Sequence, residues 1–245
     1  MKYYKENIYS NYISAHTRHL YGQASLVQIE SAFDLWEHYY NKFLPVNKEA
    51  HILDIGCGDG GFVYFLQKSG YTNCTGIDVS DEQIKAGKEM GIEGLQKGDL
   101  KDFLENNKET FDCIIARDVL EHFTKDEVYN ICQLIYQSLN KEGRLMFQSP
   151  NGEGLQVEKI YEGDYTHDTK FTVSSSRQFL QSIGFQNIQC DSVLFPVRSI
   201  KSMIRMILWK CMVGIHKLKR AVIYGSTDGI FTPNIIVIAD KTVTS

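Results

Sequence analysis

A glycine-rich turn between an apolar run and a helical segment most constrains how this chain can fold. Residues 51–61 read HILDIGCGDGG, in which a short strand-like run is followed by Gly56, Gly58 and Gly60. Glycine reaches backbone angles that are closed to other residues, and without a Cβ it lets a ligand approach the main chain. Residues 62–68 then have the apolar spacing of a helix, whose first N–H groups would face the turn. Strand, turn and helix therefore predict half of a βαβ unit with a binding surface at the turn.

Two kinds of nucleotide ligand fit such a turn. Gly56, Gly58 and Gly61 match the G-x-G-x-x-G pattern of dinucleotide-binding folds, so a dehydrogenase is one alternative. Asp54 argues against it, because a carboxylate two residues before the first glycine would repel a pyrophosphate held there. The same carboxylate could accept hydrogen bonds from the amine of S-adenosylmethionine, which has a positive sulfonium and no phosphate.

Asp54, Gly56, Gly58 and Gly60 together resemble motif I of the class I S-adenosylmethionine-dependent methyltransferases, [D/E]-x-G-x-G-x-G. The resemblance implies an α/β fold with a doubly wound, mainly parallel, seven-stranded sheet, the Rossmann-like methyltransferase fold. It implies S-adenosylmethionine as the cofactor. It also implies that the turn, with Cys57 inside it, contacts that cofactor.

Acidic residues follow the next two predicted strands. The segment 74–78 reads as a short strand ending in Asp78, where a carboxylate is placed to accept both ribose hydroxyls of a nucleoside. A helix with Ser80 as its N-cap follows. The segment 92–96 predicts a third strand, and the resemblance places the next acidic residue, Asp99, beside the adenine amino group.

The fourth predicted strand, residues 111–116, leads into RDVLEHF at 117–123. That stretch resembles the D-V-[L/I]-E-H form of the fourth methyltransferase motif, common among enzymes that act on small molecules and sugars. Residues 143–149 supply a fifth strand, and because four β-then-helix units precede it, we expect a parallel, doubly wound sheet. Ligand and chemistry then belong at the carboxyl ends of the strands. The residues predicted to contact the cofactor are Asp54, Gly56, Cys57, Gly58, Gly60, Asp78, Val79, Asp99, Leu100, Arg117 and Asp118.

Methyl transfer to a hydroxyl needs an aligned acceptor and a group that takes its proton. The loop 163–168, GDYTHD, follows the fifth strand and offers His167 as the candidate base, with Asp168 or Asp164 orienting it. A structural histidine that pins the loop is the alternative. His122 is the second catalytic candidate, and for it the alternative is that the Glu121–His122 pair only caps the next helix or closes the cofactor pocket.

Residues 163–185 resemble a pattern of methyltransferases associated with bacterial O-antigen, capsule and other surface glycan synthesis, G-D-[F/Y]-T-H-E-x-x-F-T-x-x-S-L-R-x-x-L-x-x-x-G-F. Asp168 stands where that pattern more often has Glu, and Ser176 replaces its usual Leu. The resemblance implies O-methylation of a sugar in a surface glycan or glycan precursor. Small-molecule N- or C-methylation, and cofactor binding without turnover, are the alternatives.

A basic segment lies near the C-terminus. Residues 192–227 contain seven Lys or Arg and no Asp or Glu, and their apolar residues form one helical stripe. A helix from Arg198 to Arg220 could lie on an anionic membrane surface or hold an acidic, lipid-linked substrate, and a helix packed on the body with a solvated face is the alternative. Residues 230–239 read as a final strand, which the resemblance makes antiparallel to its neighbours. The stripe consists of Ile200, Ile204, Ile207, Cys211, Ile215, Leu218 and Val222.

Composition limits the partners and the cellular compartment that we expect for this chain. A net charge of −4 and the lack of a Lys/Arg–aromatic array give no reason to expect nucleic acid. Six cysteines without a C-x-x-C pair predict no disulfide framework and no metal site, and they fit a reducing cytoplasm. We therefore expect neither a signal peptide at the polar, tyrosine-rich start of the sequence nor a membrane-spanning segment. We expect one domain with three parts: an N-terminal arm and helix (1–50, the helix at 23–44), a cofactor-binding core (51–149), and a region with substrate loop, basic helix and closing strands (150–245).

Overall fold

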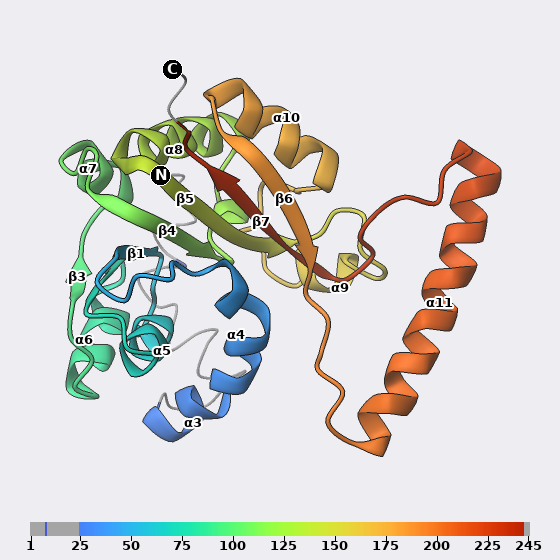
Figure 1. Cartoon of the computed structure of the whole chain (residues 1–245), viewed down its shortest axis with the longest axis horizontal. Helices are drawn as coiled ribbons and strands as arrows, with labels where there is room; N and C mark the ends of the chain where they lie inside the picture. The colour runs from blue at the N-terminus through green and yellow to red at the C-terminus, as the bar shows by residue number, and fades with distance from the viewer. Residues whose placement is uncertain (1–7, 9–24, 243–245) are drawn as a thin grey trace.

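The computed structural model describes residues 8 and 25–242, and a seven-stranded sheet forms its centre (Figure 1). The strands lie in the order β3-β2-β1-β4-β5-β7-β6. The pairs from β3 to β5 are parallel, and β7 is antiparallel to both β5 and β6. The predicted doubly wound, mainly parallel seven-stranded fold is confirmed, including its antiparallel last strand. The strands are β1 His51–Ile55, β2 Asn73–Asp78, β3 Leu95–Lys97, β4 Phe111–Arg117, β5 Leu139–Pro150, β6 Gln186–Ser192 and β7 Asn234–Asp240.

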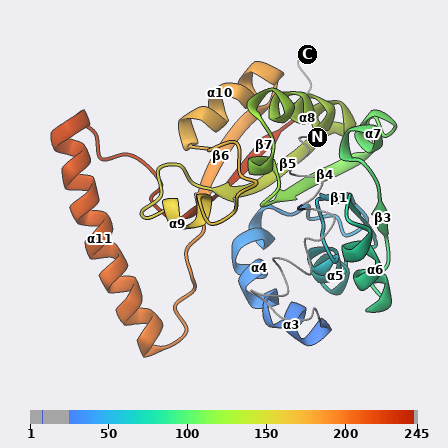
Figure 2. The same cartoon turned by 180° about the vertical axis from the view of Figure 1, so that it is seen from behind.

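Helices cover both faces of the sheet (Figures 1 and 2). Along β1, Leu53 and Ile55 are buried in one apolar cluster and Ile52 in the other, because successive side chains point to opposite faces. A strand that is buried on both faces consists of consecutive apolar residues, so β1 was easy to recognise in the sequence. One layer contains α3 Leu26–Ser31, α4 Phe33–Tyr40, α5 Gly61–Lys68 and α6 Asp81–Glu89; the other contains α7 Leu100–Glu105, α8 Lys125–Ser138 and α10 Val173–Ile183.

The helix predicted at 23–44 is two helices followed by a short 3-10 turn, η2 Asn41–Phe43. The break falls at Ala32, between α3 and α4. Just before it, the Ser31 hydroxyl donates to the carbonyl of Gln28 at 2.6 Å, a local bond that competes with the helical ladder. The apolar spacing continues through the break, so periodicity could not reveal it. The predicted arm at 1–22 lies, except for residue 8, outside the described residues.

The third strand was predicted at 92–96 but is only three residues long, Leu95–Lys97. Gly91 and Gly94 have φ angles of 81° and 77°, which are incompatible with an extended strand at those positions. Ile92 is instead buried in the apolar cluster on the α5 and α6 side of the sheet. An apolar residue is therefore buried here without belonging to the strand.

Helix α11, Ile200–Tyr224, stands apart from the two layers and is joined to them by two extended segments (Figures 1 and 2). None of its residues is buried. Half-buried positions recur every three or four residues and form the inner side of the helix, and Ala221 adjoins the last of them: Ser202, Met206, Trp209, Val213, His216 and Arg220. Among the described residues, no helix is long and apolar enough to span a membrane.

Candidate functional site

A cavity of about 290 Å³ lies at the carboxyl ends of the first four strands. Gly56 and Gly58 follow β1, Asp78 ends β2, Asp99 follows β3 and Asp118 follows β4. Parallel strands end at one edge of a sheet, so the topology brings these four segments together. Seven of the residues predicted to contact a cofactor line the cavity, namely Gly56, Gly58, Asp78, Val79, Asp99, Leu100 and Asp118, and the predicted catalytic residue His122 lines it with them.

The glycine turn has the backbone that the sequence predicted. Gly56, Gly58 and Gly60 have φ angles of 65°, 57° and 80°, in the left-handed region that favours glycine. A Cβ on Gly56 would also lie 2.5 Å from a methyl group of Val119, so that position has no space for a side chain. The N–H of Gly58 donates to the Asp78 carboxylate at 2.9 Å, which ties the turn to the end of β2.

Asp78 and Asp99 each have a structural role as well as a place in the cavity wall. Asp78 also accepts from the N–H of Ser80 at 2.8 Å. Burial raises the pKa of Asp78, although these backbone hydrogen bonds lower it in part. Asp99 is the N-cap of α7 and accepts from the N–H of Lys101 at 2.8 Å. Both carboxylates are thus fixed in place before any ligand binds.

Four other predicted cofactor residues do not line the cavity. Asp54 is 3% exposed and lies on the face of β1 that is covered by α4 and α5, where burial raises its pKa to about 7 against the opposing effect of Arg117. The Arg117 guanidinium packs over the rings of Phe62 and Trp36, at 4.5 and 4.7 Å from the ring centres. Cys57 is buried against β2, and Gly60 is the N-cap of α5. Asp54 and Arg117 thus lie on the far side of the sheet's first strand from the cavity wall, while Cys57 and Gly60 shape the turn itself.

Sequence reasoning missed much of the cavity wall. Ser80 and Gln83 were recognised only as the cap and first turn of α6, although both directly follow the Asp78 region. Lys101 lies at the beginning of α7, and Glu127 and Ile131 lie in α8, where no motif marks them. Val119 and Phe123 belong to the stretch 117–123 but were not singled out. The full set of missed residues is Ile77, Ser80, Gln83, Gly98, Lys101, Val119, Phe123, Glu127 and Ile131.

The predicted catalytic residues come from two distant segments that meet beside this cavity. His122 belongs to a 3-10 turn, η3 Leu120–His122, and its ring centre lies 4.8 Å from that of His167. The backbone carbonyl of Glu121 accepts from the N–H groups of Asp168 and Thr169, at 2.8 and 3.0 Å. These bonds fix the loop that contains His167 against the turn that contains His122.

The hydrogen bonds of the two histidines define their tautomers. The Thr166 hydroxyl donates to Asp164 at 2.6 Å and therefore accepts the Nδ1 proton of His122 at 2.7 Å. Nδ1 of His167 donates to the carbonyl of Tyr161 at 2.9 Å. In the neutral form of each ring, these bonds leave the lone pair on Nε2. We expected Asp164 or Asp168 to orient His167, whereas the hydrogen bond at its Nδ1 goes to Tyr161, and Asp164 acts on His122 through Thr166.

Charge at the site is dominated by carboxylates. Burial raises the pKa of Asp164, but hydrogen bonds from Thr166 and the nearby histidines outweigh it and hold that pKa below its usual value. Glu121 is 1% exposed, and neither of its carboxylate oxygens has a hydrogen-bond partner of good geometry among the described residues. Burial, and then the charge of Asp118, raise the pKa of Glu121 well above its usual range.

Asp118 is held in an uncommon conformation. Its φ angle of 55° is in the left-handed region, where residues other than glycine are rare and functional sites are enriched. Its carboxylate accepts from Nε2 of Gln148 at 2.8 Å, and Oε1 of Gln148 accepts from the Tyr40 hydroxyl at 2.6 Å. This chain of bonds runs from α4 through β5 and fixes the carboxylate in the cavity wall.

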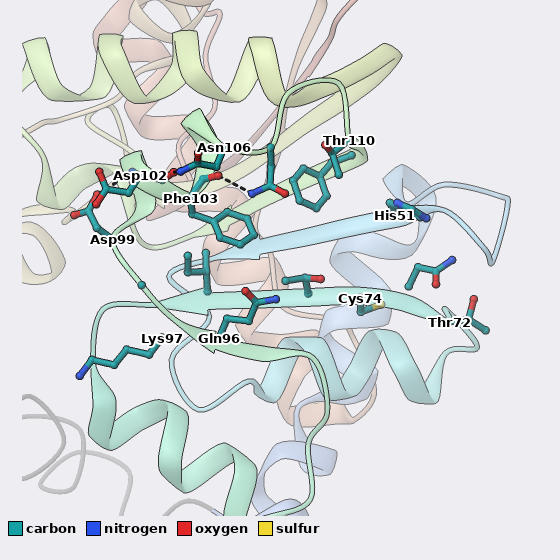
Figure 3. A pocket seen from close by; sticks show the side chains of 16 residues that line it. His51, Thr72, Cys74, Gln96, Lys97, Asp99, Asp102, Phe103, Asn106 and Thr110 are labelled. Carbon is teal, nitrogen blue, oxygen red and sulfur yellow. Dashed lines mark hydrogen bonds between the residues drawn. The ribbon is translucent and has the colours of Figure 1, made fainter.

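A second hollow, of about 830 Å³, extends along β2 and β3 and beneath α7 (Figure 3). The side chains of Asp99, Asp102, Phe103 and Asn106 line it from the α7 side, and Gln96 lines it from β3. It shares Asp99 with the smaller cavity, but none of the predicted catalytic residues lines it. The smaller cavity is therefore the candidate site.

The fold resembles that of a solved structure, a SAM dependent methyltransferase from Archaeoglobus fulgidus. The two superpose with a TM-score of 0.65 and 22% sequence identity, over 87% of this chain and 94% of that one. At this identity the comparison concerns the fold alone.

Curated relatives differ in the atom that they methylate. The phosphoethanolamine N-methyltransferase of Plasmodium falciparum is 25% identical over 158 residues, covering 59% of this chain and 57% of that protein. The malonyl-[acyl-carrier protein] O-methyltransferase of Priestia megaterium is 26% identical over 157 residues, covering 62% of this chain and 56% of that protein. The matched regions cover between 30% and 57% of the length of these and the other curated relatives.

A family model described as "Methyltransferase domain" matches residues 29–190, which include every strand from β1 to β5, most of β6 and both histidines. The chain therefore belongs to the methyltransferase-domain family and has the fold of an S-adenosylmethionine-dependent methyltransferase.

Proposed function

We propose that this chain transfers a methyl group from S-adenosylmethionine to a hydroxyl oxygen on a sugar of a surface glycan or glycan precursor. The observation that carries the proposal is the place of His122. It lines the cofactor pocket and lies 4.8 Å, ring centre to ring centre, from His167 of the loop after β5. A donor in the pocket and an acceptor at the loop would meet between them.

The pocket residues fit the parts of the donor. Asp78 would accept the ribose hydroxyls, and Asp99 would contact the adenine amino group, as the resemblance implies. Ile77, Leu100 and Val119 supply apolar walls for a flat base. Among the described wall residues, carboxylates face only one cation, Lys101. This wall suits a sulfonium better than a pyrophosphate, which disfavours a dinucleotide.

The reaction needs positioning and one place for a proton. As the acceptor oxygen bonds to the methyl carbon, the S–CH₃ bond breaks and its electron pair goes to sulfur, while the hydroxyl proton must leave. In the simplest arrangement Nε2 of His167 takes that proton, since its Nδ1 proton is used by Tyr161. Asp168 lies on the same loop, and its backbone is bonded to Glu121.

An oxygen acceptor is favoured by the ionisable groups beside the pocket. Transfer to a hydroxyl benefits from a proton acceptor, whereas transfer to a free amine does not require one. The glycan part of the proposal comes from the resemblance of residues 163–185. Three residues of that segment, Asp164, Thr166 and His167, take part in the hydrogen bonds of the two histidines described above. Small-molecule N- or C-methylation, or binding without turnover, is the alternative.

We also propose that α11 makes peripheral contact with an anionic membrane, which would place the enzyme at the inner face of the cell membrane. Its predicted apolar stripe faces away from the body, and the isoleucine, leucine and valine residues of that stripe are 52% to 80% exposed. Lys201 and Lys210 flank the stripe, as expected of an in-plane helix whose lysines reach the headgroups. Arg198 is bonded to Asp34 and Arg220 is paired with Glu153, so these two cations tether the helix to the body.

Mass spectrometry of surface glycans tests the transfer. Cells with the active protein should carry a methyl increment on a sugar that is absent from cells with His167→Ala, because only the active chain moves the methyl group. Labelled S-adenosylmethionine should transfer its label to the same glycan fraction in vitro. Binding of S-adenosylhomocysteine together with no label in any glycan fraction would favour the alternatives.

A further inference from the structure

Three side chains of the types that bind metal ions lie close together beside the cofactor pocket. Methyl transfer that uses a single base does not require such a cluster. Glu121, His122 and His167 each offer one donor atom, and these atoms all lie within 4.8 Å of one another. The Glu121 carboxylate is 1% exposed, and neither of its oxygens has a hydrogen-bond partner of good geometry among the described residues. A buried carboxylate is costly unless a charge or hydrogen bonds compensate it, and a cation bound at these atoms would supply that charge.

The outer contacts of the two histidines have the form found around metal ions. A ligating histidine almost always donates its other ring N–H to a carboxylate, carbonyl or water, which fixes the tautomer and the ring. Here Nδ1 of His167 donates to the carbonyl of Tyr161, and Nδ1 of His122 donates to Thr166, which in turn donates to Asp164. Both rings are thereby held with Nε2 as the nitrogen that can ligate.

We infer that Glu121, His122 and His167 hold a divalent cation, through one carboxylate oxygen and two imidazole nitrogens. Imidazole ligands favour Zn²⁺ or Co²⁺ over Mg²⁺, Ca²⁺ or Mn²⁺, which prefer oxygen ligands. Nitrogen and oxygen ligands lie about 2.1 Å from such ions, so the donor atoms would be at most about 4.2 Å apart. The cluster would contract slightly on binding.

A site with three protein ligands leaves coordination positions for a substrate. An acceptor hydroxyl bound there would lose its proton to water more easily, because the cation lowers its pKa. His167 would then act as a ligand and not as the base. This role rests on the proposed function, whereas binding of the ion does not. Spacing along the chain could not reveal the site, because 45 positions separate His122 from His167.

Titration of the chelator-treated full chain with CoCl₂ or ZnCl₂ tests the inference without any activity measurement. Calorimetry, and the visible absorption of bound Co²⁺, should show one ion per chain. Glu121→Gln and His167→Asn should each weaken its affinity by about 10-fold or more, since each removes a ligand. The exposed residues Glu93 and His38 provide matched controls, and Glu93→Gln and His38→Asn should bind as the wild type does.

Binding of S-adenosylhomocysteine shows that each variant is folded. Glu121 is buried, so if Glu121→Gln fails to fold, His167→Asn on the half-buried loop still decides the question. A wild-type chain that binds S-adenosylhomocysteine but takes up neither ion would overturn the inference and leave His167 as the base, with the proposed function intact. Unchanged ion affinity in both variants would overturn it equally, because the ion would then be bound elsewhere.

Discussion

At the scale of single residues, several side chains of the pocket serve the fold and the proposed chemistry together. The two oxygens of Asp78 accept from the backbone of Gly58 and Ser80, yet each carboxylate oxygen can accept more than one hydrogen bond. Ribose hydroxyls can therefore be added without breaking the bonds that fix the glycine turn. Asp99 combines a helix cap with a place in the pocket in the same way.

Asp78→Ala should weaken the binding of S-adenosylhomocysteine by about 1–3 kcal/mol, or roughly 5- to 150-fold, because buried hydrogen bonds to a charged group disappear. Isothermal titration calorimetry measures the effect. Asp81→Ala is the matched control, since its side chain is 75% exposed on the next helix. Equal affinities for the two variants would remove Asp78 from the cofactor site.

His167→Ala should slow methyl transfer by about 100-fold or more while the affinity for S-adenosylhomocysteine stays within error. The residue lies on the loop after β5 and does not line the cofactor pocket, so binding and chemistry should separate. Single-turnover rates and calorimetry on the same preparation measure the two. A normal rate would exclude His167 from the mechanism as base and as ligand.

At the scale of elements, sequence patterns located strands and motifs better than they located side-chain directions. The turn at Gly56 to Gly60 and the acidic residues that end β2 and follow β3 were predictable, because their backbone angles and places at the sheet edge follow from local rules. Arg117 was placed in the pocket by resemblance. Its side chain points instead to the α4 and α5 face, where it packs on Trp36, a contact set by tertiary packing.

The hydrogen-bond partners of the two histidines could not be predicted from the sequence either. The network from His122 through Thr166 to Asp164 depends on how the loop at 163–169 packs on the turn at 120–122. Loop conformation is not encoded in a periodic pattern. The same holds for the bond between Tyr40 and Gln148 that fixes Asp118, which joins residues 108 positions apart.

The outward stripe of α11 yields a prediction at this scale. Ile207→Asp with Leu218→Asp should abolish binding to vesicles that contain anionic lipid, because two exposed apolar side chains of the membrane-facing surface become charged. Reversing Lys201 and Lys210 to Glu should weaken binding and reduce its salt dependence. Vesicle sedimentation measures both, and transfer to a soluble acceptor serves as the control. Binding that survives both sets of changes would contradict the membrane proposal.

At the scale of the whole molecule, the carboxyl edge of the sheet concentrates buried acids. Burial raises the pKa values of Asp54, Asp78, Asp118 and Glu121. Such groups hold their protons more tightly in the folded chain than in the unfolded one. Their contribution to stability is therefore complete at low pH and is lost as the pH rises through the folded-state values. A positively charged ligand at this edge would offset that loss.

Asp54→Asn tests this electrostatic account. The pKa of Asp54 is about 7 in the folded chain and 3.8 in its ordinary state. Between these values the wild type should lose stability relative to Asp54→Asn, by up to about 1.4 kcal/mol for each pH unit. Urea unfolding at pH 5, 6 and 7 measures the difference. A difference that does not change with pH would show that Asp54 does not titrate in this range.

A crystal structure with S-adenosylhomocysteine tests the central claim most directly. We predict the nucleoside in the cavity at the carboxyl ends of β1 to β4, with ribose hydroxyls within hydrogen-bond distance of Asp78, adenine beside Asp99, and the thioether directed toward His122. Density for the nucleoside at another surface, or an empty cavity at saturating ligand, would contradict the account.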